Sequence, residues 1–143
     1  MKNKKYELTD KTMEYDGVTL HRIRALRNIW TSRWQNVKVG DLGGWIENEG
    51  NLSHKNWCWI FDEAKVFDEA RVSGNATVSG KATVGGDARV CGNARVFGNA
   101  KISGNASVFG SASVFDNAMI WGNAMVYDNA SVSVHEMIFE DFE

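Results

Sequence analysis

Alanine recurs at every sixth position through most of the chain, and a branched aliphatic residue follows each alanine by two places. The period runs without an insertion through twelve alanines, at 64, 70, 76, 82, 88, 94, 100, 106, 112, 118, 124 and 130. Val or Ile occupies all twelve positions two residues later, from Val66 to Val132. Side chains two apart in a strand point to the same side, so each unit predicts a short strand with both residues facing inward.

Each predicted strand is followed by residues that favour a tight corner. Two places after the aliphatic residue stands Gly in eight of the eleven complete repeats and Asp in the other three, and Asn often comes next. Because Gly and Asn tolerate positive φ, each hexapeptide predicts a strand of about four residues and a turn. Such a unit cannot bury its own inner face, so successive units must wind and stack as a solenoid.

The repeat resembles that of the hexapeptide-repeat left-handed parallel β-helix proteins, an acyltransferase-like superfamily in which three hexapeptides form one triangular coil. The resemblance implies an all-β prism with eighteen residues per coil and about four to five coils over residues 51–133. Cys58 and Ile60 fit the same phase one side earlier. Residues eighteen apart would stack into three inner columns: 66, 84, 102 and 120; 72, 90, 108 and 126; 78, 96, 114 and 132.

Both ends of the array predict caps, because open strand edges invite polymerisation. Residues 5–9 and 18–26 read as strands joined at the turn dipeptide Asp16–Gly17, so residues 1–50 predict a basic, Trp-rich hairpin cap. Val134, Ile138 and Phe142 recur at helical spacing, so the acidic segment 134–143 predicts a short helical cap. At 143 residues, the three parts form one folded unit.

Charge is unevenly distributed, although the formal net charge is only −2. Residues 1–40 hold nine Lys or Arg and four Asp or Glu, whereas residues 41–143 hold seven and fourteen. The acidic shaft would repel a long polyanion, which argues against nucleic acid as a partner. No apolar run is long enough to cross a bilayer, and no apolar signal-peptide segment begins the chain, so we expect a cytoplasmic protein without a membrane partner.

The candidate ligand-binding residues lie in the basic N-terminal part. In the segment HRIRALRNIW, Arg22 and Arg24 alternate about Ile23, which places both guanidinium groups on one face of a strand. Arginine donates hydrogen bonds to phosphate oxygens, and tryptophan stacks on the rings of bases. The cluster therefore predicts a small anionic ligand such as a nucleotide. An alternative is that the tryptophans only plug the end of the prism. The predicted ligand-binding residues are Arg22, Arg24, Arg27, Trp30, Trp34, Trp45 and Glu47.

Large apolar residues at outward positions of the distal coils predict a subunit interface. The predicted interface residues are Phe109, Phe115, Met119, Trp121, Met125 and Tyr127. Phe109 and Tyr127 are eighteen residues apart, as are Phe97 and Phe115, so each pair should stack. The family resemblance implies a homo-oligomer, with a trimer favoured. The alternative is that these side chains shield the corners of a monomer.

No catalytic residue, metal site or cofactor is predicted. A zinc site needs convergent ligands, but His21, His54 and His135 fall in the hairpin, in the irregular first coil and at the C-terminal end. The acyltransferases that the chain resembles use a histidine base and a protruding loop, and residues 64–132 have no such loop. We expect Cys58 to replace a buried alanine and Cys91 to be an exposed corner thiol.

The segments RIRAL at 22–26 and DLGGWIE at 41–47, together with the alanine-phased array, resemble a group of small proteins common in phages and prophages. Together with the charge asymmetry, the cluster of arginines and tryptophans and the lack of predicted catalytic groups, this resemblance favours a non-catalytic, oligomeric binding protein in the cytoplasm of the host bacterium. Such a protein would hold, and sequester, a small anionic ligand such as a host defence signalling nucleotide. Two alternatives stay open: an acyltransferase-like hexapeptide-repeat enzyme, and a structural or assembly protein of a phage particle.

Overall fold

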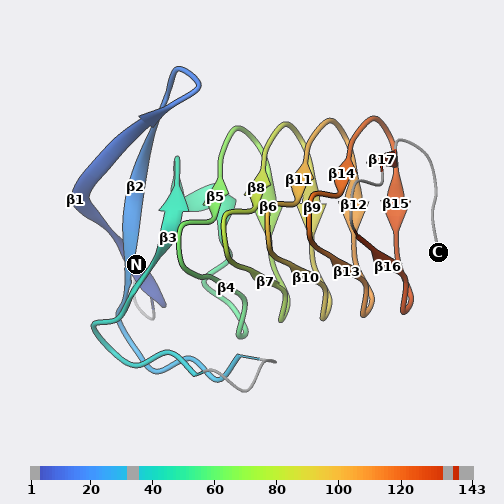
Figure 1. The fold of residues 1–143 in the computed structure, drawn as a ribbon. Coiled ribbons are helices and arrows are strands. Elements are labelled where there is room, and N and C mark those ends of the chain that lie inside the picture. Colours follow the sequence, from blue (N-terminus) through green and yellow to red (C-terminus); the bar gives the residue numbers. More distant parts are fainter. Residues whose placement is uncertain (1–3, 32–35, 134–136, 139–143) are drawn as a thin grey trace.

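The chain forms a parallel β-solenoid with a β-hairpin at its N-terminal end (Figure 1). The computed structural model describes residues 4–31, 36–133 and 137–138. The first face of the solenoid comprises β5 (Lys65–Val66), β8 (Thr83–Val84), β11 (Lys101–Ile102), β14 (Met119–Ile120) and β17 (Met137–Ile138). The second comprises β6 (Arg71–Val72), β9 (Arg89–Val90), β12 (Ser107–Val108) and β15 (Met125–Val126). The third comprises β4 (Trp59–Ile60), β7 (Thr77–Val78), β10 (Arg95–Val96), β13 (Ser113–Val114) and β16 (Ser131–Val132).

The register of the coils confirms the predicted parallel β-helix and its three inner columns. Val108, for example, pairs with Val90 below and Val126 above. All twelve aliphatic residues of the repeat are at most 1% exposed, and Cys58 is buried in the phase of the alanines. Backbone N–H groups donate to carbonyls of the next coil, as from Arg89 to Ala106 at 2.9 Å. The left hand of the winding stays a prediction.

The corners need only one residue in the left-handed region. Gly occupies it with φ of 63–68° at the eight Gly corners, and Asp68, Asp116 and Asp128 occupy it with φ of 56–57°. A Cβ at Gly74 would lie 2.9 Å from the backbone nitrogen of Gly92, so coils with Gly corners approach closely. Among the described residues, the Asn that follows a corner Gly does not have positive φ, contrary to expectation. The strands are two residues long because the corners take up the rest of each hexapeptide.

The predicted hairpin is present and extends the first face. Strands β1 (Tyr6–Tyr15) and β2 (Val18–Ala25) pair antiparallel around Asp16 and Gly17, both with positive φ. Strand β3 (Leu42–Ile46) pairs antiparallel with β2 and parallel with β5. A short 3-10 helix η1 (Glu49–Asn51) follows it. The sheet order β1-β2-β3-β5 therefore makes the hairpin a continuation of one solenoid face.

The hydrophobic core continues from the solenoid into the hairpin. Tyr6 and Ile23 are fully buried and belong to the same cluster as Trp59, which is 1% exposed. Trp45 is also buried, whereas Trp57 is 39% exposed. Trp59 thus closes the N-terminal end of the core, as the plug alternative expects. Trp45 does not take part in this plug, because it pairs with the outward-facing Lys65 and lies outside the core cluster.

Gly43 and Gly44 do not form the sharp bend that a Gly pair suggests. Both lie inside β3, and neither has positive φ. A Cβ at Gly44 would lie 2.5 Å from Cγ2 of Ile60 and 2.6 Å from the carbonyl oxygen of Ala64. The glycines are needed because β3 packs directly against the first coil.

The predicted C-terminal helix is wrong for the residues that the structure describes there. Met137–Ile138 forms β17, which pairs in parallel with β14 and places Ile138 beside Ile120. Ile138 follows Val132 by six residues, so the aliphatic period continues where a helical spacing also fits. Residues 134–136 and 139–143, including Val134 and Phe142, lie outside the described residues. Within the described ranges, no helix has the length and apolar character to span a membrane.

Candidate functional site

The head arginines that were predicted to bind a ligand have partners within the protein. Nη1 of Arg22 lies 2.9 Å from Oε2 of Glu63, and its guanidinium lies over the Trp45 ring, 5.2 Å from the centroid. Nε1 of Trp45 donates to Oε1 of Glu63 at 3.2 Å. The hydrogen bonds from Arg22 and Trp45 hold the pKa of Glu63 below its usual value. Arg22, Trp45 and Glu63 thus form a polar cluster in which Nε of Arg22 is buried without a hydrogen-bond partner.

The other head residues are placed separately. Arg24 donates from Nε and Nη2 to Oε2 of Glu7, at 2.9 and 2.7 Å. Arg27 donates to the backbone oxygen of His54 at 2.9 Å. Oε1 of Glu47, a predicted ligand-binding residue, accepts from the backbone nitrogen of Asp68 at 2.8 Å. Trp30 is 55% exposed, and Trp34 lies outside the described residues. Among the members of this set that the structure describes, it brings together Arg22 and Trp45.

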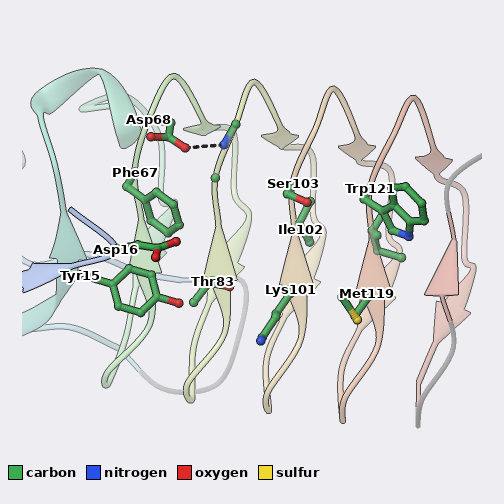
Figure 2. Close-up of a pocket in the computed structure, with 13 residues that line it drawn as sticks. Tyr15, Asp16, Phe67, Asp68, Thr83, Lys101, Ile102, Ser103, Met119 and Trp121 are labelled. Carbon is green, nitrogen blue, oxygen red and sulfur yellow. Dashed lines mark hydrogen bonds between the residues drawn. The ribbon is translucent and has the colours of Figure 1, made fainter. Parts of the chain in front are cut away.

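A groove of about 350 Å³ lies on the first face beside the hairpin tip (Figure 2). Tyr15 and Asp16, at the end of β1 and in the turn, reach over this face next to Phe67. The rings of Tyr15 and Phe67 meet edge to face at 5.5 Å, and Nζ of Lys65 lies 5.4 Å from the Tyr15 centroid. The hairpin tip therefore supplies one wall of the groove.

One edge of the prism carries a column of outward residues that shapes the groove. This edge column consists of Phe67, Gly85, Ser103 and Trp121, each eighteen residues after the last. A Cβ at Gly85 would lie 2.6 Å from Cε2 of Phe67, so the Phe67 ring lies over Gly85. Trp121 is 41% exposed at the far end. Gly85 and Trp121 are two coils apart, roughly 10 Å, with only the small Ser103 between them.

The floor of the groove combines a cation with hydroxyl groups. Thr83, Lys101 and Met119 project outward from β8, β11 and β14. Lys101 is exposed and takes part in none of the salt bridges found in the described part of the chain. Asp68 is occupied, because its Oδ2 accepts from the backbone nitrogen of Gly86 at 3.0 Å. The groove therefore offers aromatic rings at both ends and a positive charge between them.

The predicted interface residues lie on the distal coils but on more than one side of the prism. The two expected stacks are confirmed: Phe97 with Phe115 at 5.0 Å and Phe109 with Tyr127 at 5.5 Å. Met119 lies on the first face, and Trp121 lies in the edge column that follows it. Met125 lies on the second face, and Tyr127 lies at the far edge of that face. Phe115 belongs to the third edge, between the third and first faces. We call Met125, Tyr127 and Phe109 the second-face patch.

The histidine and cysteine positions favour structural roles. In His54, Nδ1 accepts from the backbone nitrogen of Lys5 at 3.1 Å, and Nε2 lies 2.7 Å from Oε1 of Glu49. The His54 ring also stacks on Tyr6 at 4.1 Å. Among the described residues, which exclude His135, no group of three His, Cys, Asp or Glu could hold a metal. Cys91 is half-buried, rather than fully exposed as expected.

The fold and these surfaces define the class of the protein as a parallel β-solenoid with an added hairpin. A family model described as the YdcK beta solenoid repeat matches residues 70–86 and 88–101. No curated protein matches the sequence. The family match agrees with the repeat fold of the central coils.

Proposed function

We propose that this protein is a non-catalytic binding protein whose first-face groove holds a small, flat, anionic ligand of the nucleotide class. The observation that carries the proposal is the edge column, in which Phe67 and Trp121 flank small residues beside the exposed Lys101. A concave site with apolar rings and a few convergent polar groups is the usual form of a small-molecule site. If the protein is encoded by a phage, tight binding would sequester a host signalling nucleotide.

The aromatic ends of the groove suit a planar base. The Phe67 ring covers Gly85, so the free space begins above the next coil and ends at Trp121. That interval, roughly two coils or 10 Å, accommodates one planar ring beside the Trp121 indole. Stacking of a base on an aromatic side chain contributes about 1–3 kcal/mol and needs no particular base identity. The proposal therefore specifies a class of ligand and not one nucleotide.

The charges on the first face suit the phosphate of such a ligand. Lys65, Lys81 and Lys101 occur on successive coils of this face or its leading corner. Nζ of Lys65 donates a hydrogen bond to the backbone oxygen of Glu63 at 3.1 Å. Lys101 is therefore the cation available inside the groove. A lysine ammonium binds phosphate as a point charge. The Asp16 carboxylate, in the hairpin tip that lines the groove, can accept hydrogen bonds from a sugar hydroxyl or a base amino group.

The acyltransferase-like alternative is not favoured by the surroundings of His54. A histidine base needs a free ring nitrogen to take a proton from the substrate. Both ring nitrogens of His54 have partners, the backbone nitrogen of Lys5 and the Glu49 carboxylate. The ring is also covered by Tyr6. We therefore assign His54 to anchoring the N-terminal strand and assign no reaction to the protein.

Calorimetric titration with cyclic nucleotides, ADP-ribose and nucleoside phosphates tests the proposal. Trp121→Ala should weaken the binding of the best nucleotide by about 5- to 150-fold, the equivalent of one lost base stack. Lys101→Ala should weaken it by about tenfold. Arg95→Ala removes an exposed cation from the third face and should leave affinity unchanged. If no nucleotide binds, the proposed function is contradicted. If Arg22→Ala/Arg24→Ala abolishes binding while Trp121→Ala and Lys101→Ala do not weaken it, the binding site lies at the head arginines and not in the groove.

We also propose that the protein self-associates through the second-face patch, as a homo-oligomer with a trimer favoured. Met125 is 39% exposed on the second face, and the stacked rings of Phe109 and Tyr127 follow the strands of the same face. Exposed methionine and aromatic side chains in one patch are typical of surfaces that become buried between subunits. Contact through the second face leaves the groove on the first face open to a ligand.

A further inference from the structure

A lysine and a cysteine are buried together where the N-terminal strand meets the first coil. Lys5 and Cys58 are both 0% exposed. Nζ of Lys5 lies 3.2 Å from Sγ of Cys58 and 2.6 Å from the Cys58 backbone oxygen. Its other near partners are the backbone oxygens of Lys55 and Asn56, at 3.4 and 3.5 Å. A fully buried lysine is normally paired with a carboxylate, whereas here the side-chain partner is a thiol.

The surroundings set how the two groups share a proton. Burial lowers the pKa of Lys5, which favours the neutral amine. Burial also raises the pKa of Cys58, while the neighbouring Lys5 acts in the opposite direction. Both directions favour the neutral amine and the neutral thiol at rest, so the thiolate forms only as the amine takes the thiol proton across the 3.2 Å contact. The thiolate is the form of cysteine that reacts with oxidants.

We propose that Lys5 and Cys58 form a reversible sulfur–nitrogen cross-link when the protein meets a hydroperoxide. The juxtaposition of an amine and a thiol at contact distance, with no competing side chain between them, carries the proposal. A sulfenic acid normally condenses with the nearest nucleophile, either a thiol or a nitrogen. At this site the nearest nucleophile is the Lys5 amine.

The chemistry balances with one equivalent of peroxide. The Lys5 amine takes the Cys58 proton, and the thiolate attacks the peroxide, so that an S–O bond forms and the O–O bond breaks. The released hydroxide takes the proton back from the ammonium and leaves as water. The neutral amine then attacks the sulfur of the sulfenic acid, an S–N bond forms, and a second water leaves. The sulfur is oxidised by two electrons, and the peroxide is reduced to two waters in total.

The cross-link would fasten the start of β1 to the first coil. Lys5 immediately precedes β1, and Cys58 immediately precedes β4. The bond would close a loop between residues 53 positions apart. Cys91 provides an internal comparison, because it is half-buried on a corner and the cation that acts on it is the Arg89 guanidinium and not an amine.

Peptide mass spectrometry of the full chain after hydrogen peroxide treatment tests this proposal. The expected product is a linked pair of peptides containing Lys5 and Cys58, two hydrogen masses below their sum, which dithiothreitol separates. It should persist in Cys91→Ser and be lost in Cys58→Ala, a variant that restores the repeat residue at this phase and should fold. Lys5→Met should instead accumulate sulfenic or sulfinic acid at Cys58.

Two outcomes overturn the proposal. One is a wild-type Cys58 that stays reduced at a peroxide dose that oxidises Cys91. The other is a Cys58 that passes to sulfinic acid while Lys5 stays unmodified. Circular dichroism of each variant before treatment separates loss of the cross-link from loss of the fold.

Discussion

Substitution of Ala106 by leucine tests the inward alanine column directly. Ala106 is fully buried, and it lies one coil from Ala88 and from Ala124, both also fully buried. Coils are about 4.8 Å apart, and carbon atoms touch at about 3.5–4.0 Å, so about 1 Å of slack separates successive residues. Leucine adds three carbon atoms to this space. Overpacking of this kind costs about 1–3 kcal/mol, which we expect as the loss in unfolding free energy.

Urea denaturation of Ala106→Leu beside Ser107→Leu measures this effect with a matched control. Ser107 is the next residue, faces outward on β12 and is half-buried. The same leucine there should change the unfolding free energy by no more than about 0.5 kcal/mol. Equal stability of Ala106→Leu and the wild type, or equal losses in the two variants, would refute the inward orientation of the alanines.

Two further predictions concern the head cluster and the second-face patch. The contacts of Glu63 with Arg22 and Trp45 depress its folded pKa, so their stabilisation is present above the usual value of 4.5 and is lost as pH falls through the folded value. Glu63→Gln should lower stability at pH 7 by only about 0.2–1 kcal/mol, since Glu63 is largely exposed. Its melting temperature should converge with that of the wild type as the pH falls below 4.5 and through the lower folded pKa of Glu63, and a difference that stays constant throughout this fall would contradict the account. Light scattering should give the wild type a multiple of its 15.9 kDa chain mass and Met125→Lys the monomer mass, whereas a monomeric wild type excludes the interface.

The repeat made most of the solenoid predictable from the sequence. A period of six places every aliphatic residue relative to its neighbours, so the pairing of Val90 with Val108 follows from arithmetic alone. At Ile138 the sequence supports two predictions. Ile138 keeps the six-residue period of the strands, and it also fits a helical spacing with Val134 and Phe142. Pairing with β14 favours the strand, because the parallel backbone hydrogen bonds that place Ile138 beside Ile120 need an extended chain.

The head was less predictable because its contacts join residues far apart in the chain. Arg22 meets Glu63 and Arg24 meets Glu7, and no local pattern signals either pair. The alternation of Arg22 and Arg24 indicated a shared strand face but not that carboxylates occupy it. The role of Gly43 and Gly44 is equally hidden in the sequence, since the groups they make room for include Trp59, Ile60 and Ala64 of the first coil.

Half of the groove could have been found by extending the column reasoning to outward positions. The edge column has aromatic residues at 67 and 121 with Gly85 and Ser103 between them, which predicts a gap two coils wide. The other half depends on the hairpin. Strand β1 continues to Tyr15, well beyond the expected end at residue 9, and its register shifts between Leu8 and Thr12. Only this longer strand carries Tyr15 to Phe67.

Two-dimensional ¹H–¹⁵N NMR during nucleotide titration tests the proposed binding groove most directly, because each backbone amide reports its own surroundings. The account predicts that the nucleotide shifts the amides of Thr83, Lys101 and Ser103 together with the Trp121 indole, and leaves those of the third face unchanged. Shifts confined to residues 22–27, or no shift with any nucleotide, would contradict it.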